Sequence, residues 1–213
     1  DGSCERCESN VSKKALPQWV FAITKYADQL LEMDDIDWPS KIKTMQKNWI
    51  GKSEGTTVSF NLDEYIENSV IETFTTRIDT IYGVTFVVLA PEHPIVDQIV
   101  QPEFSDEVKE YVYNASRQTE IERTSTEKEK TGVFTGAYCI NPLSEERIPI
   151  FIGDYVLSTY GTGAVMGVPA HDQRDYDFAK KYNLNIKIVV SPKKVDEKKL
   201  DKAWSGDGIQ VNS

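Results

Sequence analysis

Apolar residues recur along the chain with two different periods, and the change falls at about a quarter of its length. In the first part, residues 15–33 place apolar side chains three and four positions apart, which predicts one amphipathic helix. Trp38 and Pro39 interrupt this pattern because proline cannot continue a helix. Ser40 then marks the cap of a second, shorter helix that runs to about residue 48.

Beyond a glycine-bounded joint at 51–55, β-branched and aromatic residues dominate instead. They predict strands at 57–61, 70–76, 85–90, 133–140, 148–153 and 186–191, and a charged surface segment at 193–202. Residues 92–131 read as solvated helix, with an exposed charged run at 127–130. Strands outnumber helices without alternating regularly, so we expect an α+β fold with a β-barrel-like sheet. The predicted division is a helical linker segment at 1–50 and a domain at 51–213.

A strand, a turn and a helix with crowded polar groups are predicted over residues 160–182. Pro169 stops the strand, Asp172 is placed to cap the helix, and Asp175 stands at the third helical position. The helix dipole favours negative charge there, so we expect a lowered carboxyl pKa and a cation-binding role for Asp175. The alternative is that Asp175 only caps its own helix.

The composition narrows the class of protein. The hydrophobic content of 39% supports a real core, and no apolar run approaches the roughly 20 residues of a membrane helix. A net charge of −10 argues against gripping long nucleic acid through its phosphates, although a nucleic-acid end could still enter a pocket. The polar start predicts no signal peptide, and the missing initiator Met suggests an excised fragment.

Three cysteines raise the question of a metal site. Cys4 and Cys7 form half of a four-ligand zinc pattern, and no second pair follows them. The two histidines, His93 and His171, are distant in sequence from that pair. We therefore expect no complete zinc site in this chain, unless ligands upstream complete one. Free thiols, Cys139 included, fit a reducing cytoplasm.

Two glycine motifs and the usual catalytic triads can be set aside. The glycines of segment 161–167 are spaced one residue too widely for a dinucleotide-binding turn. Residues 51–53 (GKS) resemble the end of a P-loop, but Gln46 stands where that loop requires glycine. No nucleophile has an obvious histidine partner. His171 could be a general base, but a structural hydrogen bond at a turn is the favoured role. Catalysis would therefore depend on positioning a water and stabilising charge.

A second polar cluster lies at residues 73–80, where a predicted strand ends. Strand alternation aims Thr73 and Thr75 to one side, with Arg77 at the point where the strand stops. Hydroxyl and guanidinium groups at such a place can bind phosphate or ribose oxygens. Threonine is also a common strand former, so a purely structural role stays open.

Segments 75–80 (TTRIDT) and 161–176 (GTGAVMGVPAHDQRDY) together resemble the editing insertion of bacterial-type leucyl-tRNA synthetases, which are class I enzymes. Residues 49–55 (WIGKSEG) resemble the hinge that joins this insertion to the synthetase body. The resemblance covers essentially the whole chain and assigns 51–213 to the editing domain. It implies a β-barrel flanked by helices. Ile78 departs from the pattern, because the family usually has proline there.

The resemblance also implies a reaction. The editing domain hydrolyses the ester that links isoleucine, norvaline or methionine to the 3′-terminal adenosine of leucine tRNA, after transfer to the tRNA, and it spares leucyl-tRNA. A leucine pocket rejects such analogues only about 10- to 200-fold, so a second hydrolytic site is required. The parent enzyme attaches leucine with ATP and Mg, but this chain lacks the ATP-site signatures, so we expect no aminoacylation and no cofactor for editing.

By resemblance, two residues carry the chemistry: Asp175 anchors the substrate ammonium group, and Thr80 sterically bars leucine. The implied substrate-binding residues are Thr75, Thr76, Arg77, Tyr160, Met166, Val168, His171 and Asp172. The implied partners are the terminal adenosine of mischarged leucine tRNA and the rest of the synthetase. We expect a cytoplasmic monomer that does not contact membranes.

Two other functions compete with this interpretation. A non-catalytic module that binds the tRNA end would carry the same polar groups but would not hydrolyse the ester. An editing domain of a valine or isoleucine enzyme shares the glycine core of the motif. It is disfavoured by Met166 and by the sequence HDQRD at 171–175.

Overall fold

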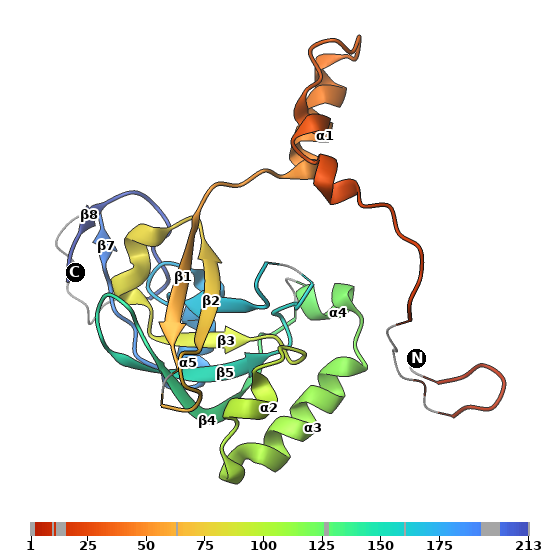
Figure 1. Cartoon of the computed structure of the whole chain (residues 1–213). Helices are drawn as coiled ribbons and strands as arrows, with labels where there is room; N and C mark the ends of the chain where they lie inside the picture. The colour runs from red at the N-terminus through yellow and green to blue at the C-terminus, as the bar shows by residue number, and fades with distance from the viewer. Residues whose placement is uncertain are drawn as a thin grey trace. The chain divides into compact units, whose positions relative to one another are not determined.

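A computed structural model gives the fold for residues 3–9, 11, 16–62, 64–125, 128–159, 161–192 and 201–212. The chain divides into two compact units. The smaller is Lys13–Glu54, and the larger joins Asp1–Ser12 to Gly55–Ser213 (Figure 1). The two units are described separately below.

The smaller unit contains less helix than the apolar pattern predicts. It has two 3₁₀ helices and one α-helix: η1 (Ile23–Tyr26), η2 (Gln29–Leu31) and α1 (Ser40–Ile50). The prediction of a single helix at 15–33 is therefore wrong. Its side chains at Trp19, Val20 and Phe21 are exposed, and a short helix without a packed apolar face is only marginally stable. The second helix is confirmed, and it ends at Gly51 with a left-handed φ of 61°.

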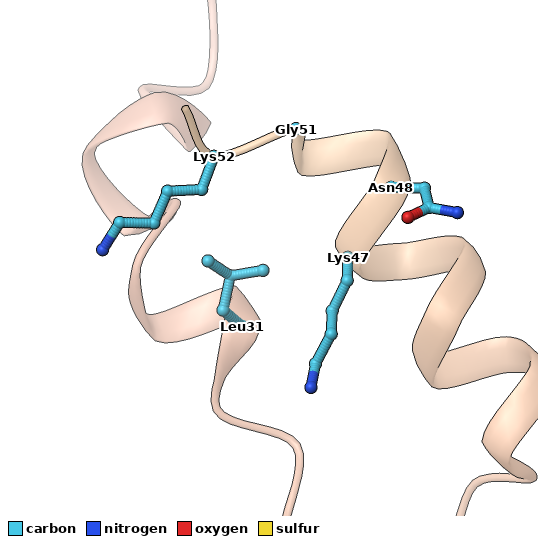
Figure 2. A pocket seen from close by; sticks show the side chains of 5 residues that line it. All are labelled: Leu31, Lys47, Asn48, Gly51 and Lys52. Atoms are coloured by element: carbon cyan, nitrogen blue, oxygen red, sulfur yellow. The ribbon is translucent and has the colours of Figure 1, made fainter. Parts of the chain in front are cut away.

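A hollow lies inside this unit, between the end of η2 and the end of α1. It is lined by Leu31, Lys47, Asn48, Gly51 and Lys52 (Figure 2). Lys52 Nζ also lies 3.3 Å from Asp28 Oδ1, in an exposed ion pair. The lining offers ammonium and amide groups without an acid–base pair, so we assign no chemistry to it.

The larger unit is built on one six-stranded sheet. Its strands are β1 (Thr56–Asn61), β2 (Val70–Thr75), β3 (Phe86–Leu89), β4 (Gly132–Ile140), β5 (Arg147–Gly153) and β6 (Ala164–Gly167). They are ordered β2-β1-β4-β5-β3-β6, and only the β3–β5 pair is parallel. These strands confirm the predicted positions to within one or two residues.

The sheet curls, but it does not close. Its two edge strands, β2 and β6, lie near each other, with Cα atoms within 8 Å. Among the described residues no hydrogen-bonded ladder joins them. The α+β class is therefore confirmed, whereas a closed β-barrel is not. In Figure 1, β1 and β2 run steeply across β3 and β5, as expected for a strongly curled sheet.

Short helices cover the sheet and connect its strands. They are η3 (Ile78–Gly83), α2 (Val96–Ile99), η4 (Pro102–Phe104), α3 (Ser105–Ser116), α4 (Glu120–Thr124) and α5 (Gln173–Lys181). α2, η4 and α3 pack beside β4 (Figure 1). The prediction of an exposed charged run at 127–130 is wrong at Lys128, because the Nζ of Lys128 pairs with the buried carboxylate of Asp154.

The strand expected at 186–191 forms only in part. β7 is limited to Val190–Ser191, which pairs with β8 (Ile209–Gln210) as a separate two-stranded sheet. β7 is short because its partner has only two residues to offer, and a strand needs a neighbour for its backbone groups. The surface segment predicted at 193–202 lies outside the described residues except at its last two positions.

Two apolar cores lie on opposite faces of β3. Val87 and Leu89 join one core, whereas Phe86 and Val88 join the other, as the alternation of a strand requires. The second core takes up Phe178 of α5, whose ring stacks on Phe86 with centroids 5.2 Å apart. This packing fixes α5, and therefore its amino-terminal turn, against the end of β6.

Candidate functional site

The curl of the sheet brings the two polar motifs together. Ile71, Thr73 and Thr75 point to the inner side of β2, as their burial alternation shows. From β6, Ala164 lies in the same core and Met166 packs against it. Because β2 and β6 adjoin, residues about ninety positions apart in sequence line one region.

Hydroxyl groups fix the threonine-rich turn that follows β2. Thr75 Oγ1 accepts the N–H of Arg77 at 3.0 Å, and Thr80 Oγ1 donates to the carbonyl of Arg77 at 2.8 Å. Thr80 is only 2% exposed. Thr73 is fully buried, and its hydroxyl has no hydrogen-bond partner. An unpaired buried hydroxyl of this kind costs free energy, so the site is not fully satisfied internally.

Arg77 and Asp79 form a two-pronged ion pair at the start of η3. Arg77 Nε lies 3.0 Å from Asp79 Oδ1, and Nη2 lies 2.9 Å from Oδ2. The hydrogen bonds from Arg77 lower the pKa of Asp79, and those to Asp79 raise the pKa of Arg77. The guanidinium is thus charged but already balanced by a carboxylate.

The opposite side of the site is the turn that leads into α5. Asp172 Oδ1 accepts the N–H groups of Arg174 at 2.8 Å and of Asp175 at 3.3 Å, which confirms the predicted helix cap. Asp172 Oδ2 also pairs with Arg174 Nη2 at 3.1 Å. Burial opposes ionisation of Asp172, but the hydrogen bonds from Arg174 prevail and its pKa is lowered.

Asp175 differs from its expected state. Its Oδ2 accepts the N–H of Val168 at 2.8 Å, so the carboxyl group reaches out of α5 to the end of β6. The alternative of a mere helix cap is therefore wrong. Burial, with a contribution from the Asp172 carboxylate, raises the pKa of Asp175 to about 7. The predicted lowering of this pKa is wrong. The helix dipole stabilises the carboxylate by less than desolvation and the like charge of Asp172 destabilise it.

His171 is engaged at both ring nitrogens. Nε2 lies 3.1 Å from the N–H of Val189 and 3.2 Å from that of Val190, so Nε2 is the acceptor. The proton then sits on Nδ1, which faces the carbonyl of Trp204 at 2.9 Å. Burial lowers the histidine pKa. The ring therefore holds backbone in place, and the expected structural hydrogen bond is confirmed.

The remaining predicted site residues fall into three groups. Met166 is partly buried at the inner face of β6, and Val168 is buried and contributes its N–H to Asp175. Thr76 has an exposed side chain beyond the end of β2. Tyr160 lies outside the described residues.

The structure adds a segment that sequence reasoning missed, residues 203–210. Arg77 Nη1 donates to the carbonyl of Ser205 at 3.3 Å, and Gln210 Nε2 donates to the carbonyl of Asp79 at 2.6 Å. The same segment meets the α5 turn, since the N–H of Ala203 donates to Gln173 Oε1 at 3.1 Å. It thus ties both sides of the site together. No local pattern marks it, because its partners are 30 to 131 positions away.

Within the residues that the structure covers, no group of three or more His, Cys, Asp or Glu side chains could hold a metal ion. Cys4 and Cys7 are free thiols. None of the helices over the described ranges is long and apolar enough to cross a membrane.

Fold and site together define a mixed α+β domain in which two polar motifs meet where the edge strands β2 and β6 adjoin. A helix carboxylate, that of Asp175, is bonded to the end of β6. A family model described as "Leucyl-tRNA synthetase, editing domain" matches residues 47–213. The chain belongs to this family of leucyl-tRNA synthetase editing domains.

Similar proteins agree with this assignment. Leucine–tRNA ligase of Rubrobacter xylanophilus is 50% identical over 213 residues, and that of Dehalococcoides mccartyi is 54% identical over 214. Each match covers the whole chain but 26% of the relative, so the chain spans about a quarter of those proteins. A solved LeuRS–tRNA–LeuAMS complex from Agrobacterium radiobacter is 37% identical, with a TM-score of 0.71, covering 96% of this chain and 24% of that one.

Proposed function

We propose that this domain hydrolyses the ester of mischarged leucine tRNA after the amino acid has been transferred to the tRNA. The substrates would be the esters of isoleucine, norvaline and methionine, and leucyl-tRNA would be spared. The observation that carries the proposal is the Asp175 carboxylate, which is bonded to the end of β6, the strand that adjoins the strand before the threonine-rich turn. Membership of the editing-domain family supports it.

Asp175 is suited to hold the ammonium group of an aminoacyl ester. One oxygen, Oδ2, is occupied by the N–H of Val168, and the nearby guanidinium of Arg174 is bonded to Asp172. Its raised pKa reflects a buried carboxyl group that lacks enough positive charge around it. A substrate ammonium would supply that charge, and binding would then favour the ionised carboxylate.

The chemical step needs no cofactor. A water oxygen attacks the carbonyl carbon of the ester, the bond from that carbon to the ribose oxygen breaks, and the ribose oxygen takes up a proton. The protein would contribute by holding the ester and water in line and by donating hydrogen bonds to the developing charge. Thr75 and Thr76 would contact the substrate and the terminal adenosine, with Arg77 assisting tRNA placement.

Thr80 would exclude leucine from the site. It is buried, and its hydroxyl is fixed to the carbonyl of Arg77, so its methyl group has a fixed position. A rigid methyl group is an effective steric barrier against one branching pattern of a side chain. Linear or differently branched side chains would pass, while γ-branched leucine would not.

The test of the proposal is deacylation by Asp175→Ala. We expect the rate with isoleucyl- or norvalyl-tRNA to fall at least 100-fold, because the ammonium group loses its counter-charge in a desolvated site. Asp177→Ala is the matched control, since Asp177 lies on the exposed face of the same helix, where its Oδ1 accepts a hydrogen bond from Gln173. Full activity of the Asp175 variant would contradict the proposal.

Thr80→Ala tests the exclusion of leucine. Removing the methyl and hydroxyl groups should allow hydrolysis of leucyl-tRNA, which the unaltered chain spares, at a rate within about tenfold of isoleucyl-tRNA. The measurement is the release of labelled leucine from charged tRNA. Continued protection of leucyl-tRNA by a folded Thr80→Ala variant would show that another residue acts as the barrier.

The same assay separates the proposal from a non-catalytic tRNA-end module, which would bind the ester without releasing amino acid. We further propose that the parent protein is a cytoplasmic, monomeric leucine–tRNA ligase that charges leucine tRNA with ATP and Mg. In that protein the partners of this domain would be the rest of the synthetase and the terminal adenosine of tRNA.

A further inference from the structure

Trp204 is an exposed aromatic residue with a fixed backbone beside the candidate site. Its N–H donates to the carbonyl of Ala170 at 2.8 Å, and its carbonyl faces His171 Nδ1 at 2.9 Å. The indole Nε1 donates to the carbonyl of Asp207 at 3.3 Å, and the ring lies against Gly206, where a Cβ would come within 2.8 Å of it. The indole nevertheless belongs to a residue that is 39% exposed. A flat ring is thus held at the surface in one orientation.

A guanidinium group is bonded to the backbone that follows this ring. Arg77 donates to the carbonyl of Ser205, the residue that follows Trp204, and it also donates to the carboxylate of Asp79. A guanidinium carries five N–H groups, and these bonds engage Nε, one N–H of Nη1 and one of Nη2. Among the described residues, two N–H groups therefore have no acceptor, while the charge is already balanced by Asp79.

An exposed indole, with a guanidinium bonded to the carbonyl of the next residue, suits a nucleobase. Bases stack on tryptophan and on guanidinium planes, and the stacking energy depends little on base identity. The chain has a net charge of −10, which argues against binding RNA mainly through its phosphates. Stacking is the interaction that would remain effective for such an acidic protein.

We propose that Trp204, together with Arg77, forms a stacking site for the nucleobase that precedes the terminal adenosine of a tRNA 3′ end. The inference rests on the proposed editing function for the identity of the RNA. The adenosine ester would enter between β2 and β6. The preceding base would stack on the indole, and the free N–H groups of Arg77 would meet its ribose or phosphate oxygens.

The kinetic test compares two substrates with wild type, Trp204→Phe and Trp204→Leu. The substrates are isoleucyl-tRNA and isoleucyl-adenosine, which has no preceding base. For Trp204→Leu, the preference in kcat/KM for tRNA over isoleucyl-adenosine should fall about tenfold, mainly through KM. Trp204→Phe should retain most of the preference, since a phenyl ring still stacks. A purely structural role would impair both substrates equally and leave the preference unchanged, which would overturn the inference.

A binding measurement separates this inference from the proposed function. The other tryptophans, at 19, 38 and 49, lie in the smaller unit, so Trp204 is the reporter of the larger one. Titration with the trinucleotide CCA should quench tryptophan fluorescence in the wild type and leave that of Trp204→Phe unchanged. Equal quenching in both would overturn the stacking site. If CCA quenches Trp204 while the wild type deacylates no mischarged tRNA, the editing function fails and the stacking site stands.

Discussion

At the scale of single residues, Asp175 shows how a binding site can be electrostatically incomplete. Its helix-end position favours a carboxylate, but burial and the carboxylate of Asp172 oppose it and raise its pKa to about 7. Ionisation of Asp175 therefore destabilises the folded domain when no substrate is bound. The same group becomes an effective binding site once a cation arrives, since the penalty for its charge has already been incurred during folding.

This balance gives a stability prediction for Asp175→Asn, which keeps an oxygen for the N–H of Val168. The folded pKa of about 7 exceeds the unfolded value of about 3.9, so the folded state binds more protons between these values. The wild type should therefore lose unfolding free energy as pH rises from about 4 to 7 and stay lower above that. The variant should be more stable by a few kcal/mol at pH 8 and nearly equal at pH 4.

Urea unfolding at both pH values measures this difference. A gap that is the same at pH 4 and pH 8 would mean that Asp175 does not titrate in this range. The ionised form should also be the one that binds the substrate ammonium. Deacylation should therefore decline as pH falls below about 7.

At the scale of elements, the site depends on how η3 follows β2. Ile78 is the first residue of η3 and is 41% exposed, so an apolar side chain stands in water where the family usually has proline. The first helical position suits proline, because its fixed φ matches the helix and its N–H is not needed there. The turn itself is already fixed by Thr75 and Thr80, so its geometry does not require the proline.

Ile78→Pro should therefore stabilise the domain slightly. Arg77 has φ −123°, which suits a residue before proline, while its ψ of 60° must widen, so we expect a gain near the lower end of about 0.4–1 kcal/mol. Thermal unfolding of Ile78→Pro against Ile78→Ala measures it, since both variants remove the exposed apolar side chain. A lower melting temperature for the proline variant would show that the turn needs the freedom of isoleucine.

At the scale of the whole larger unit, Arg123 ties separate segments together. It is 5% exposed, and its guanidinium donates to the carbonyls of Asp154 and Val156 and to the carboxylate of Glu92. α4 is thus bound to the loop between β5 and β6, whose far end leads into β6. The loss of one partner from a buried ion pair leaves several polar groups unsatisfied.

Arg123→Leu should lower the free energy of unfolding by about 3–5 kcal/mol. Arg147→Leu is the matched control. Its pair with Glu64 is about half exposed, and the guanidinium also lies 4.0 Å from the centre of the Tyr138 ring, so we expect a loss of about 1 kcal/mol. Denaturant unfolding of the two variants compares them directly. Equal losses would show that the buried network adds nothing beyond a surface pair.

The sequence by itself determined the strands of the sheet, the cap at Asp172 and the two polar motifs. All of these depend on local rules, namely alternation along a strand, capping by a short acid, and the interruption of a strand by Pro169. It failed for the helix at 15–33, whose stability would have to come from packing that a local pattern does not contain.

Only the tertiary structure decided how the motifs meet, because the meeting depends on a sheet that curls until β2 and β6 adjoin. It alone placed the 203–210 segment against Arg77 and His171. It also reversed the expected pKa of Asp175, since desolvation is set by every segment that packs around a group and not by its neighbours in sequence.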